Sequence, residues 1–510
     1  MRKFRVIMRY LHHIAIIATA IVALLASSCD RDNDLYNIAV EKQISCSFDR
    51  QVIKIEYSLA GTTPEGEAYS VTATASDDWV TSIDYPRPGV IAVEVEANGG
   101  ELRTTTIAIS ATGHATAKVK LTQLGAPSDA SHTLMYYFFG TSLSRFFDQN
   151  LDDAKKAIED GILGENNRVL FFRQKGRSTA YIGELCYDPV NGGVVERIIK
   201  DDISIEGALV TPEAVGANIA MMAEEAPAQR YGLILAGHGH GWITREALNS
   251  EEEEASTFSH TPYVEGIKNS WQPAAGAEIT RAFGENNVQV DITELASGIE
   301  LSGVDIEYIL FDACFMSNIE AIYDLRNVTD YVIASPCEIM GRGFPYHRTL
   351  PFLFQANGAS SDLRGAAESY YKYYRDEYTS NARCGSVAVY DCAEMDALAE
   401  ATRAVVATAT NDYDPSKLQT YEGQPVHIFY DFGQWAETVA TDEAALAAFR
   451  DQLSRTIIAK YTLSSFYSAY GVYGTYPIDE DIFSGATTSA PSAAYPAVWS
   501  ETNWYKTVWE

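Results

Sequence analysis

The stretch Tyr308-Ile-Leu-Phe-Asp-Ala-Cys-Phe-Met-Ser-Asn-Ile-Glu-Ala-Ile-Tyr323 decides the fold that we predict for this chain. The run Ile306–Phe311 has the length and apolar character of a buried strand. A three-residue apolar spacing then predicts a helix through Met316, Ile319, Ile322 and Leu325. Asp312 and Cys314 lie on the turn between the two, where a helix N-terminus would favour a thiolate. The alternative for a single cysteine is a buried core residue.

A second stretch, Tyr231-Gly-Leu-Ile-Leu-Ala-Gly-His-Gly-His-Gly-Trp242, repeats this pattern of an apolar strand followed by polar residues. In open parallel sheets, ligands bind beyond the carboxyl ends of the strands, so we expect His238 and Cys314 to share one edge. A histidine can take the thiol proton and then give it to a leaving amine. The N–H groups of Gly239 and Cys314 could hold an oxyanion.

These motifs carry a family resemblance. His-Gly-x-Gly-Trp from His238, followed by Asp-Ala-Cys-x-Met-x-x-x-Glu from Asp312, resembles the clostripain family of cysteine peptidases, in the clan of caspases and gingipains. The pocket loop around Glu338 and the strand Tyr470–Pro477 resemble the family further, so that the likeness runs from about Thr133 to the C-terminus. It implies a caspase-like α/β/α sandwich with a mostly parallel sheet.

The resemblance also implies roles for single residues. Cys314 would be the nucleophile, His238 the base and then the acid, and Gly239 an oxyanion donor. Relatives cleave after Arg or Lys, and Asp312 would face the same side as Cys314, since residues i and i+2 of an extended segment do so. Ser335 and Glu338 complete the predicted substrate pocket.

Two doubts about Asp312 stay open at this point. Asp312 could instead cap the following helix, a common role for Asp at such a turn. Arg342 of the pocket loop could also neutralise it, with Glu338 compensating.

Other chemistries have weaker support in the sequence. His238 and His240 could form a metal pair, but the next forty residues offer only His260 and carboxylates as further ligands. We therefore predict no metal site and no required cofactor, although the calcium dependence of some relatives leaves calcium open. Ser335 lacks a Gly-x-Ser-x-Gly elbow, which favours a wall of the pocket over a nucleophile, and Cys337 is interpreted likewise.

The N-terminus is typical of a targeting signal. Basic residues precede a short apolar run, Ile14–Leu25, and small residues precede Cys29, so residues 1–28 resemble a lipoprotein signal peptide. Cys29 would then be the lipidated first residue, and the acidic tract Asp30–Asp34 resembles a surface-export signal of Bacteroidetes lipoproteins. We expect a lipid anchor in the outer membrane and exposure at the cell surface. The alternative is ordinary secretion, with Cys29 removed or idle.

Composition narrows the class of partner. The net charge of −31 argues against nucleic acid and anionic membrane as partners, and the expected partners are protein or peptide substrates. The cysteine count is odd, and no C-x-x-C spacing occurs among Cys29, Cys46, Cys186, Cys314, Cys337, Cys384 and Cys392. We therefore expect few or no structural disulfides.

Residues 38–125 predict a separate all-β domain. Apolar and polar residues alternate over several short runs that are divided by turn residues, which is typical of an immunoglobulin-like sandwich. The region resembles the BACON domain, which implies possible glycan binding; a simple spacer is the alternative. Trp79 would be a sugar platform or, in the other interpretation, a core residue. Residues 29–37 form an acidic tether, 126–132 a linker, and 133–510 the peptidase domain.

Strands alternate with helices after the linker, which predicts a parallel sheet covered on both faces. A long loop from Ile243 to about Gly284 carries Glu251–Glu254 and is either a solvated acidic flap or functional. Only Arg245, Lys268 and Arg281 are basic between the His and Cys motifs, so we expect activity as a single chain rather than after self-cleavage.

The sequence thus predicts a lipid-anchored cysteine endopeptidase that cleaves after Arg or Lys. The alternative is a catalytically inactive surface adhesin that binds host glycan through the β-sandwich. Transpeptidation through the same thioester is a third possibility, because only the acceptor differs.

Overall fold

The structure is a computed structural model, and it describes residues 36–46, 50–60, 70–98, 100, 102–123, 130–163, 167–176, 178–187, 193–205, 210–249, 274–281, 290–354, 356–357, 360–490 and 494–510. The predicted signal peptide, Cys29, the tract Asp30–Asp34 and the acidic run Glu251–Glu254 lie outside these ranges. Within them, no helix has the length and apolar character needed to cross a membrane.

The N-terminal region is a β-sandwich, as predicted. Its two four-stranded sheets have the orders β1-β3-β6-β5 and β2-β8-β7-β4. The strands are β1 (Ile38–Val40), β2 (Gln43–Cys46), β3 (Gln51–Leu59), β4 (Val71–Ala75), β5 (Val80–Arg87), β6 (Val90–Val95), β7 (Arg103–Ala111) and β8 (Ala117–Gln123). Alternate residues of both sheets, such as Ile55 and Ile107, fill one core. Trp79 belongs to this core, and the guanidinium of Arg103 lies 4.4 Å from its ring centre.

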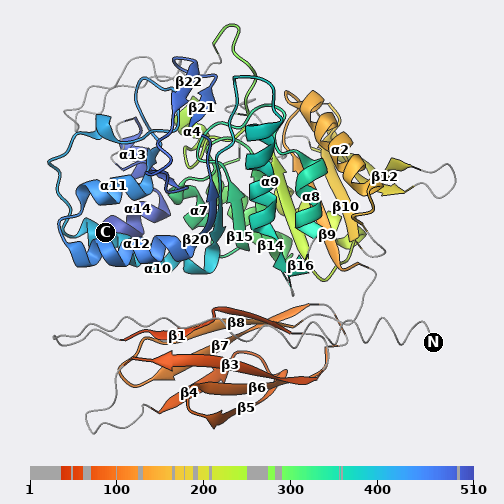
Figure 1. Ribbon diagram of the computed structural model, residues 1–510. Coiled ribbons are helices and arrows are strands. Elements are labelled where there is room, and N and C mark those ends of the chain that lie inside the picture. Colours follow the sequence, from red (N-terminus) through yellow and green to blue (C-terminus); the bar gives the residue numbers. More distant parts are fainter. Residues whose placement is uncertain are drawn as a thin grey trace.

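The second region is built on a nine-stranded sheet of order β12-β11-β10-β9-β13-β14-β15-β18-β20 (Figure 1). The strands are β9 (His132–Phe138), β10 (Asn167–Gln174), β11 (Thr179–Tyr187), β12 (Val194–Ser204), β13 (Tyr231–Ala236), β14 (Ile306–Asp312), β15 (Thr329–Ala334), β18 (Val387–Asp391) and β20 (Ile457–Tyr461). The five central strands are parallel, and an antiparallel pair extends each side. The predicted parallel sheet is therefore its centre.

Helices cover both faces of this sheet. One row contains α2 (Ser144–Glu159), α8 (Tyr346–Phe354) and α9 (Leu363–Asp376), and the other contains α3 (Pro212–Glu225), α6 (Ile292–Ser302) and α7 (Ile319–Leu325). Next to β18 and β20 lie α10 (Met395–Val406), α11 (Phe432–Val439), α12 (Glu443–Thr456), α13 (Pro496–Trp499) and α14 (Asn503–Trp509).

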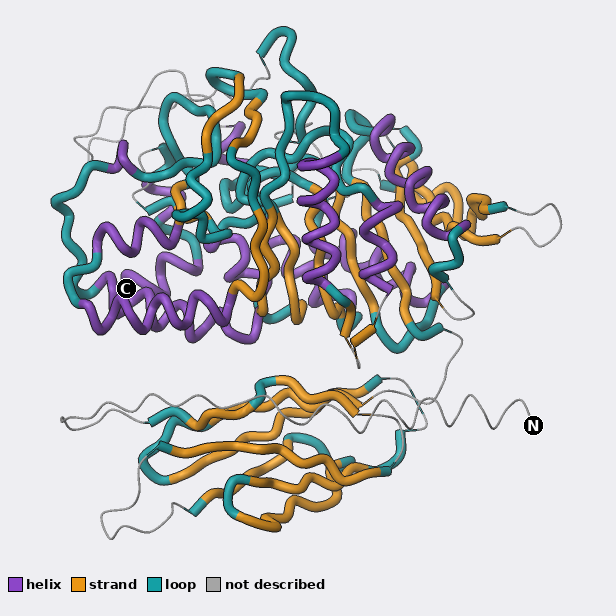
Figure 2. The backbone as a smooth tube through the Cα atoms, viewed as in Figure 1, coloured by secondary structure: helices purple, strands orange, loops and turns teal. Residues whose placement is uncertain are grey.

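Loops gather at the carboxyl end of the central strands, on the side away from the β-sandwich (Figure 2). The short elements of the chain are α4 (Arg245–Asn249), β16 (Ala356–Asn357), β17 (Ser360–Ser361), η1 (Cys392–Glu394), η2 (Pro415–Lys417), β19 (Tyr430–Asp431), β21 (Ser465–Ser468), β22 (Gly474–Pro477) and β23 (Thr487–Thr488). The β-sandwich meets the opposite, amino end of the sheet through Lys120, which pairs with Asp330 at 2.6 Å. The six described cysteines form no disulfide.

Candidate active site

The two sequence motifs meet at the ends of neighbouring strands. Ala236 of β13 is paired with Asp312 of β14, so His238 and Cys314 each lie two residues beyond a matched pair. Gly239 lies between the two ends. A Cβ at Gly239 would stand 2.2 Å from the carbonyl oxygen of Cys314, so that only glycine fits there.

Cys314 does not lie at a helix N-terminus, which corrects the expectation from the sequence. The turn continues through Phe315, whose positive φ of 59° is unusual for a bulky residue, and α7 begins only at Ile319. Asn318 is the cap of α7, because its side chain accepts the N–H of Ala321, so Asp312 is not the cap. Burial raises the pKa of the Cys314 thiol well above its usual value, while the Ile339 N–H donates to its sulfur at 3.0 Å and opposes that rise.

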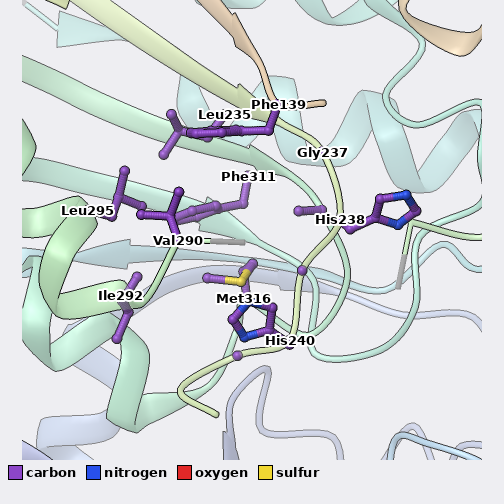
Figure 3. Close-up of a pocket in the computed structure, with 13 residues that line it drawn as sticks. Phe139, Leu235, Gly237, His238, His240, Val290, Ile292, Leu295, Phe311 and Met316 are labelled. Atoms are coloured by element: carbon purple, nitrogen blue, oxygen red, sulfur yellow. The ribbon is translucent and has the colours of Figure 1, made fainter. Parts of the chain in front are cut away.

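His238 is half-buried on the loop that follows β13. Its Nε2 lies 2.9 Å from the hydroxyl of Ser142, which follows β9. Figure 3 shows the imidazoles of His238 and His240 directed away from each other. A small cavity of about 50 Å³ is lined by this loop, with both histidines, and by apolar residues that include Leu235, Phe311 and Met316 (Figure 3). His240 is buried, and burial lowers the pKa of its imidazole.

A short segment of the chain itself lies along the predicted pocket loop. This inserted segment, Ile279–Arg281, pairs with the loop as an antiparallel strand: the Arg281 N–H donates to the Ile339 carbonyl at 2.8 Å, and the Gly341 N–H donates to the Ile279 carbonyl at 2.7 Å. The Arg281 carbonyl accepts the N–H of Gly239 at 3.0 Å and that of Cys314 at 3.3 Å. Our sequence analysis predicted these same two N–H groups as the donors to an oxyanion.

The side chain of Arg281 fills a closed acidic pocket. It is fully buried, as is Asp312, and its Nη1 lies 3.0 Å from the Asp312 carboxylate. Nε donates to the Gly341 carbonyl at 3.1 Å, and Nη2 donates to the Asn150 side-chain oxygen at 2.7 Å and to the Arg342 carbonyl at 3.3 Å. Every guanidinium nitrogen therefore has an oxygen partner. We call this site the primary pocket.

Asp312 is held in place from its other side. Its carboxylate accepts the N–H of Phe344 at 3.2 Å and the hydroxyl of Tyr346 at 2.8 Å. A Cβ at Gly343, where φ is 72°, would stand 2.3 Å from a carboxylate oxygen, so the loop needs glycine at this position. Burial raises the pKa of Asp312, and the neighbouring Arg281 opposes that rise.

Arg342 does not neutralise this carboxylate, which resolves the doubt raised by the sequence. Its guanidinium pairs with Asp153 of α2 at 2.8 Å. His347 lies 3.3 Å from the carboxylate of Asp153. Arg342 contributes to the primary pocket only through its backbone carbonyl.

The other two predicted pocket residues have different surroundings. Glu338 is fully buried and contacts Thr280 of the inserted segment rather than the Arg281 side chain. Ser335 forms a turn, since its hydroxyl donates to the Cys337 carbonyl at 3.1 Å and accepts the Cys337 N–H at 3.3 Å. The hydrogen bonds of Ser335 shape the loop and do not reach the inserted segment.

Asn150 is a residue of the primary pocket that our sequence analysis did not name. It lies on the buried face of α2 with Phe147, Leu151 and Ala154. The available signal was a polar residue at the helical spacing of the buried apolar residues of α2.

The chain is similar to a known protein family and to several solved structures. The profile of the clostripain family matches residues 269–470. A secreted C11 cysteine protease of Bacteroides thetaiotaomicron is 31% identical, with 75% of this chain and 100% of that chain covered and a TM-score of 0.62. An inactive zymogen C11 protease of Parabacteroides distasonis is 27% identical over 76% of this chain and 100% of that one, with a TM-score of 0.60.

A further secreted C11 protease of B. thetaiotaomicron, solved with an irreversible peptide inhibitor, is 25% identical over 74% of this chain and 99% of that one, with a TM-score of 0.58. No curated protein sequence matches. The fold and the relatives define a cysteine-type peptidase. The chain belongs to the clostripain family.

Proposed function

We propose that this chain is an arginine-directed cysteine endopeptidase made as a zymogen. In this zymogen, the inserted segment occupies the active site of the chain to which it belongs. The observation that carries the proposal is the position of Arg281. Its carbonyl meets the N–H groups of Gly239 and Cys314, and its side chain pairs with Asp312 in the primary pocket. A peptide substrate must place its reactive carbonyl and its recognised side chain in the same relation.

The proposed chemistry uses His238 and Cys314 as a dyad. His238 takes the thiol proton, and the sulfur forms a bond to the carbonyl carbon of the substrate. The oxyanion accepts the N–H groups of Gly239 and Cys314, and the C–N bond breaks as His238 protonates the leaving amine. Water, deprotonated by His238, then releases the acid and restores the thiol. An amine in place of water would give transpeptidation.

The primary pocket favours arginine over lysine. Gly341, Asp312 and Asn150 offer oxygens on three sides of a planar group, which suits the fork of donors on a guanidinium. An ammonium is a single compact charge and cannot reach all three sides at once. We therefore narrow the expected specificity from Arg or Lys to Arg.

The zymogen proposal replaces our expectation that the single chain is active. In the intact chain, the proposed oxyanion donors and the primary pocket are both engaged by Arg281. The relative described as an inactive zymogen supports the idea that such chains need activation. We propose that cleavage of the peptide bond after Arg281 frees the site.

The remaining proposals concern location and the β-sandwich. We propose lipidation at Cys29, with the peptidase at the outer cell surface and protein or peptide substrates. Partition of the wild-type chain into detergent, and its release by Cys29→Ala, would test the anchor. The burial of Trp79 favours a spacer over a sugar platform, and the peptidase relatives do not favour the inactive adhesin.

Intact-mass analysis of the purified chain tests the main proposal. We expect wild type to convert into two fragments that end and begin at the bond after Arg281, and to gain activity on Arg peptides. Cys314→Ala and His238→Ala should remain intact and inactive, whereas the control Cys186→Ala should process normally. Full activity of unprocessed wild type, or unchanged processing of Arg281→Ala at this bond, would overturn the zymogen. Normal turnover by Cys314→Ala would overturn the dyad.

A further inference from the structure

A second buried carboxylate lies beside the inserted segment, one residue away from Arg281. Successive side chains of an extended strand point to opposite faces, so Thr280 points away from the primary pocket. Thr280 is only 3% exposed, whereas Ile279 is 48% exposed. The site thus encloses the side chains of Arg281 and Thr280 and leaves that of Ile279 largely open.

The surroundings of Thr280 are polar and closed. Its hydroxyl donates to one oxygen of Glu338, and the hydroxyl of Ser468 donates to the other. The N–H of Ala469 lies 3.1 Å from both carboxylate oxygens. Glu338, Ser468 and Ala469 therefore form what we call the hydroxyl pocket.

We infer that the hydroxyl pocket selects threonine or serine as the second residue before the scissile bond. The inference rests on the proposed function, because it takes the inserted segment as a bound substrate. Valine has the shape of threonine but would leave one oxygen of a buried carboxylate with the Ala469 N–H alone. Loss of one hydrogen bond to a charged group corresponds to about a 10- to 100-fold lower rate.

The size of the hydroxyl pocket argues against a basic residue at this position. The Thr280 hydroxyl already reaches Glu338 directly, so a longer side chain would need Ser468 and Ala469 to move. An acidic residue would meet the Glu338 carboxylate and be repelled. A short hydroxyl side chain remains the chemistry that fits.

Matched peptides on processed wild type provide the first test. Two substrates share arginine before the scissile bond and differ only by threonine or valine before that arginine. We expect kcat/KM to be about 10- to 100-fold higher for the threonine peptide, and Glu338→Gln to reduce this ratio. Equal rates, or a preference for a basic residue, would overturn the hydroxyl pocket and leave the proposed function intact. Failure to cleave any arginine peptide would instead overturn the proposed function.

The chain itself provides a second test that needs no change in Glu338. Thr280→Val should slow self-cleavage after Arg281 by about 10- to 100-fold, as followed by intact mass. Thr280→Ser should restore most of the rate, because it keeps the hydroxyl. Thr74→Val, the same substitution at an exposed position of β4, is the matched control and should process like wild type. Normal processing of Thr280→Val, or failure of Thr280→Ser to recover, would count against recognition of the hydroxyl.

Discussion

Two ion pairs hold separate segments of the chain against opposite ends of the large sheet. At the carboxyl end, Arg281 pairs with Asp312, and both side chains are fully buried. At the amino end, Lys120 of the β-sandwich pairs with Asp330, with 31% and 24% of the side chains exposed. Removing one partner of a buried pair leaves an uncompensated charge, whereas water and salt screen a pair with solvent access. The two ion pairs have similar chemistry, but we expect the loss of the buried pair to have the larger effect.

Asp312→Asn removes the charge of the buried pair and should have the largest effect. Breaking a buried pair typically costs about 3–5 kcal/mol, which corresponds to a self-cleavage rate about 100- to 4000-fold lower. The rate of conversion after Arg281, measured by intact mass, tests this expectation. Asp152→Asn on the exposed face of α2 is the control and should convert normally. An unchanged rate in Asp312→Asn would mean that the buried pair is structural and does not recognise arginine.

Asn150→Leu keeps the charge pair and removes one neutral acceptor from the same pocket. Loss of the hydrogen bond to Arg281 should lower kcat/KM for arginine peptides by about 10- to 100-fold. Lysine peptides should lose less, so that the arginine-to-lysine ratio falls. Steady-state rates on paired peptides measure this ratio. A parallel loss for both peptides would indicate general damage to α2 instead of lost recognition.

The sequence predicted that the two motifs meet at one end of the sheet, because apolar strands followed by polar turns are local patterns. His238, Gly239, Cys314 and Asp312 all follow from two such stretches. The helix after Cys314 was placed too early, because the turn contains Phe315 in a positive-φ conformation that no local pattern signals. The expected thiolate near a helix N-terminus failed for the same reason.

Local sequence patterns could not predict the antiparallel edge strands or the occupied pocket. β12 is an edge strand rich in exposed charged residues, so it lacks the alternation that marks a half-buried strand. Arg281 was visible only as one of three basic residues between the motifs. Its position in the primary pocket depends on Asn150, Asp312 and Gly341, which are far apart in the chain. Such non-local convergence requires the three-dimensional structure.

Glu338 adds a third buried ionisable group at the carboxyl end and predicts a dependence of stability on pH. Burial, with a further contribution from Glu422, raises the pKa of Glu338 from 4.5 to about 7. Between these values the unfolded chain releases a proton that the folded chain retains, so this group favours unfolding increasingly as pH rises. The comparison is made in a Cys314→Ala background, which prevents processing. As the pH rises from 5 to 7, we expect the melting temperature to fall less in Glu338→Gln than in its parent, by on the order of a few degrees. Parallel melting curves would contradict the raised pKa.

Lys120→Ala removes the partly exposed pair and should have the smallest effect. The pair keeps contact with water, so we expect a loss of about 0–1 kcal/mol in the free energy that holds the β-sandwich against the sheet. Peptidase activity should stay within about twofold of wild type, because Lys120 contacts the end of the sheet opposite the active site. Lys118→Ala, an exposed neighbour on β8, is the control. Limited proteolysis at low and high salt measures the docking, and arginine-peptide rates measure the site. A tenfold loss of activity in Lys120→Ala alone would show that the β-sandwich positions the catalytic end of the sheet, and the two ion pairs would then be coupled rather than independent.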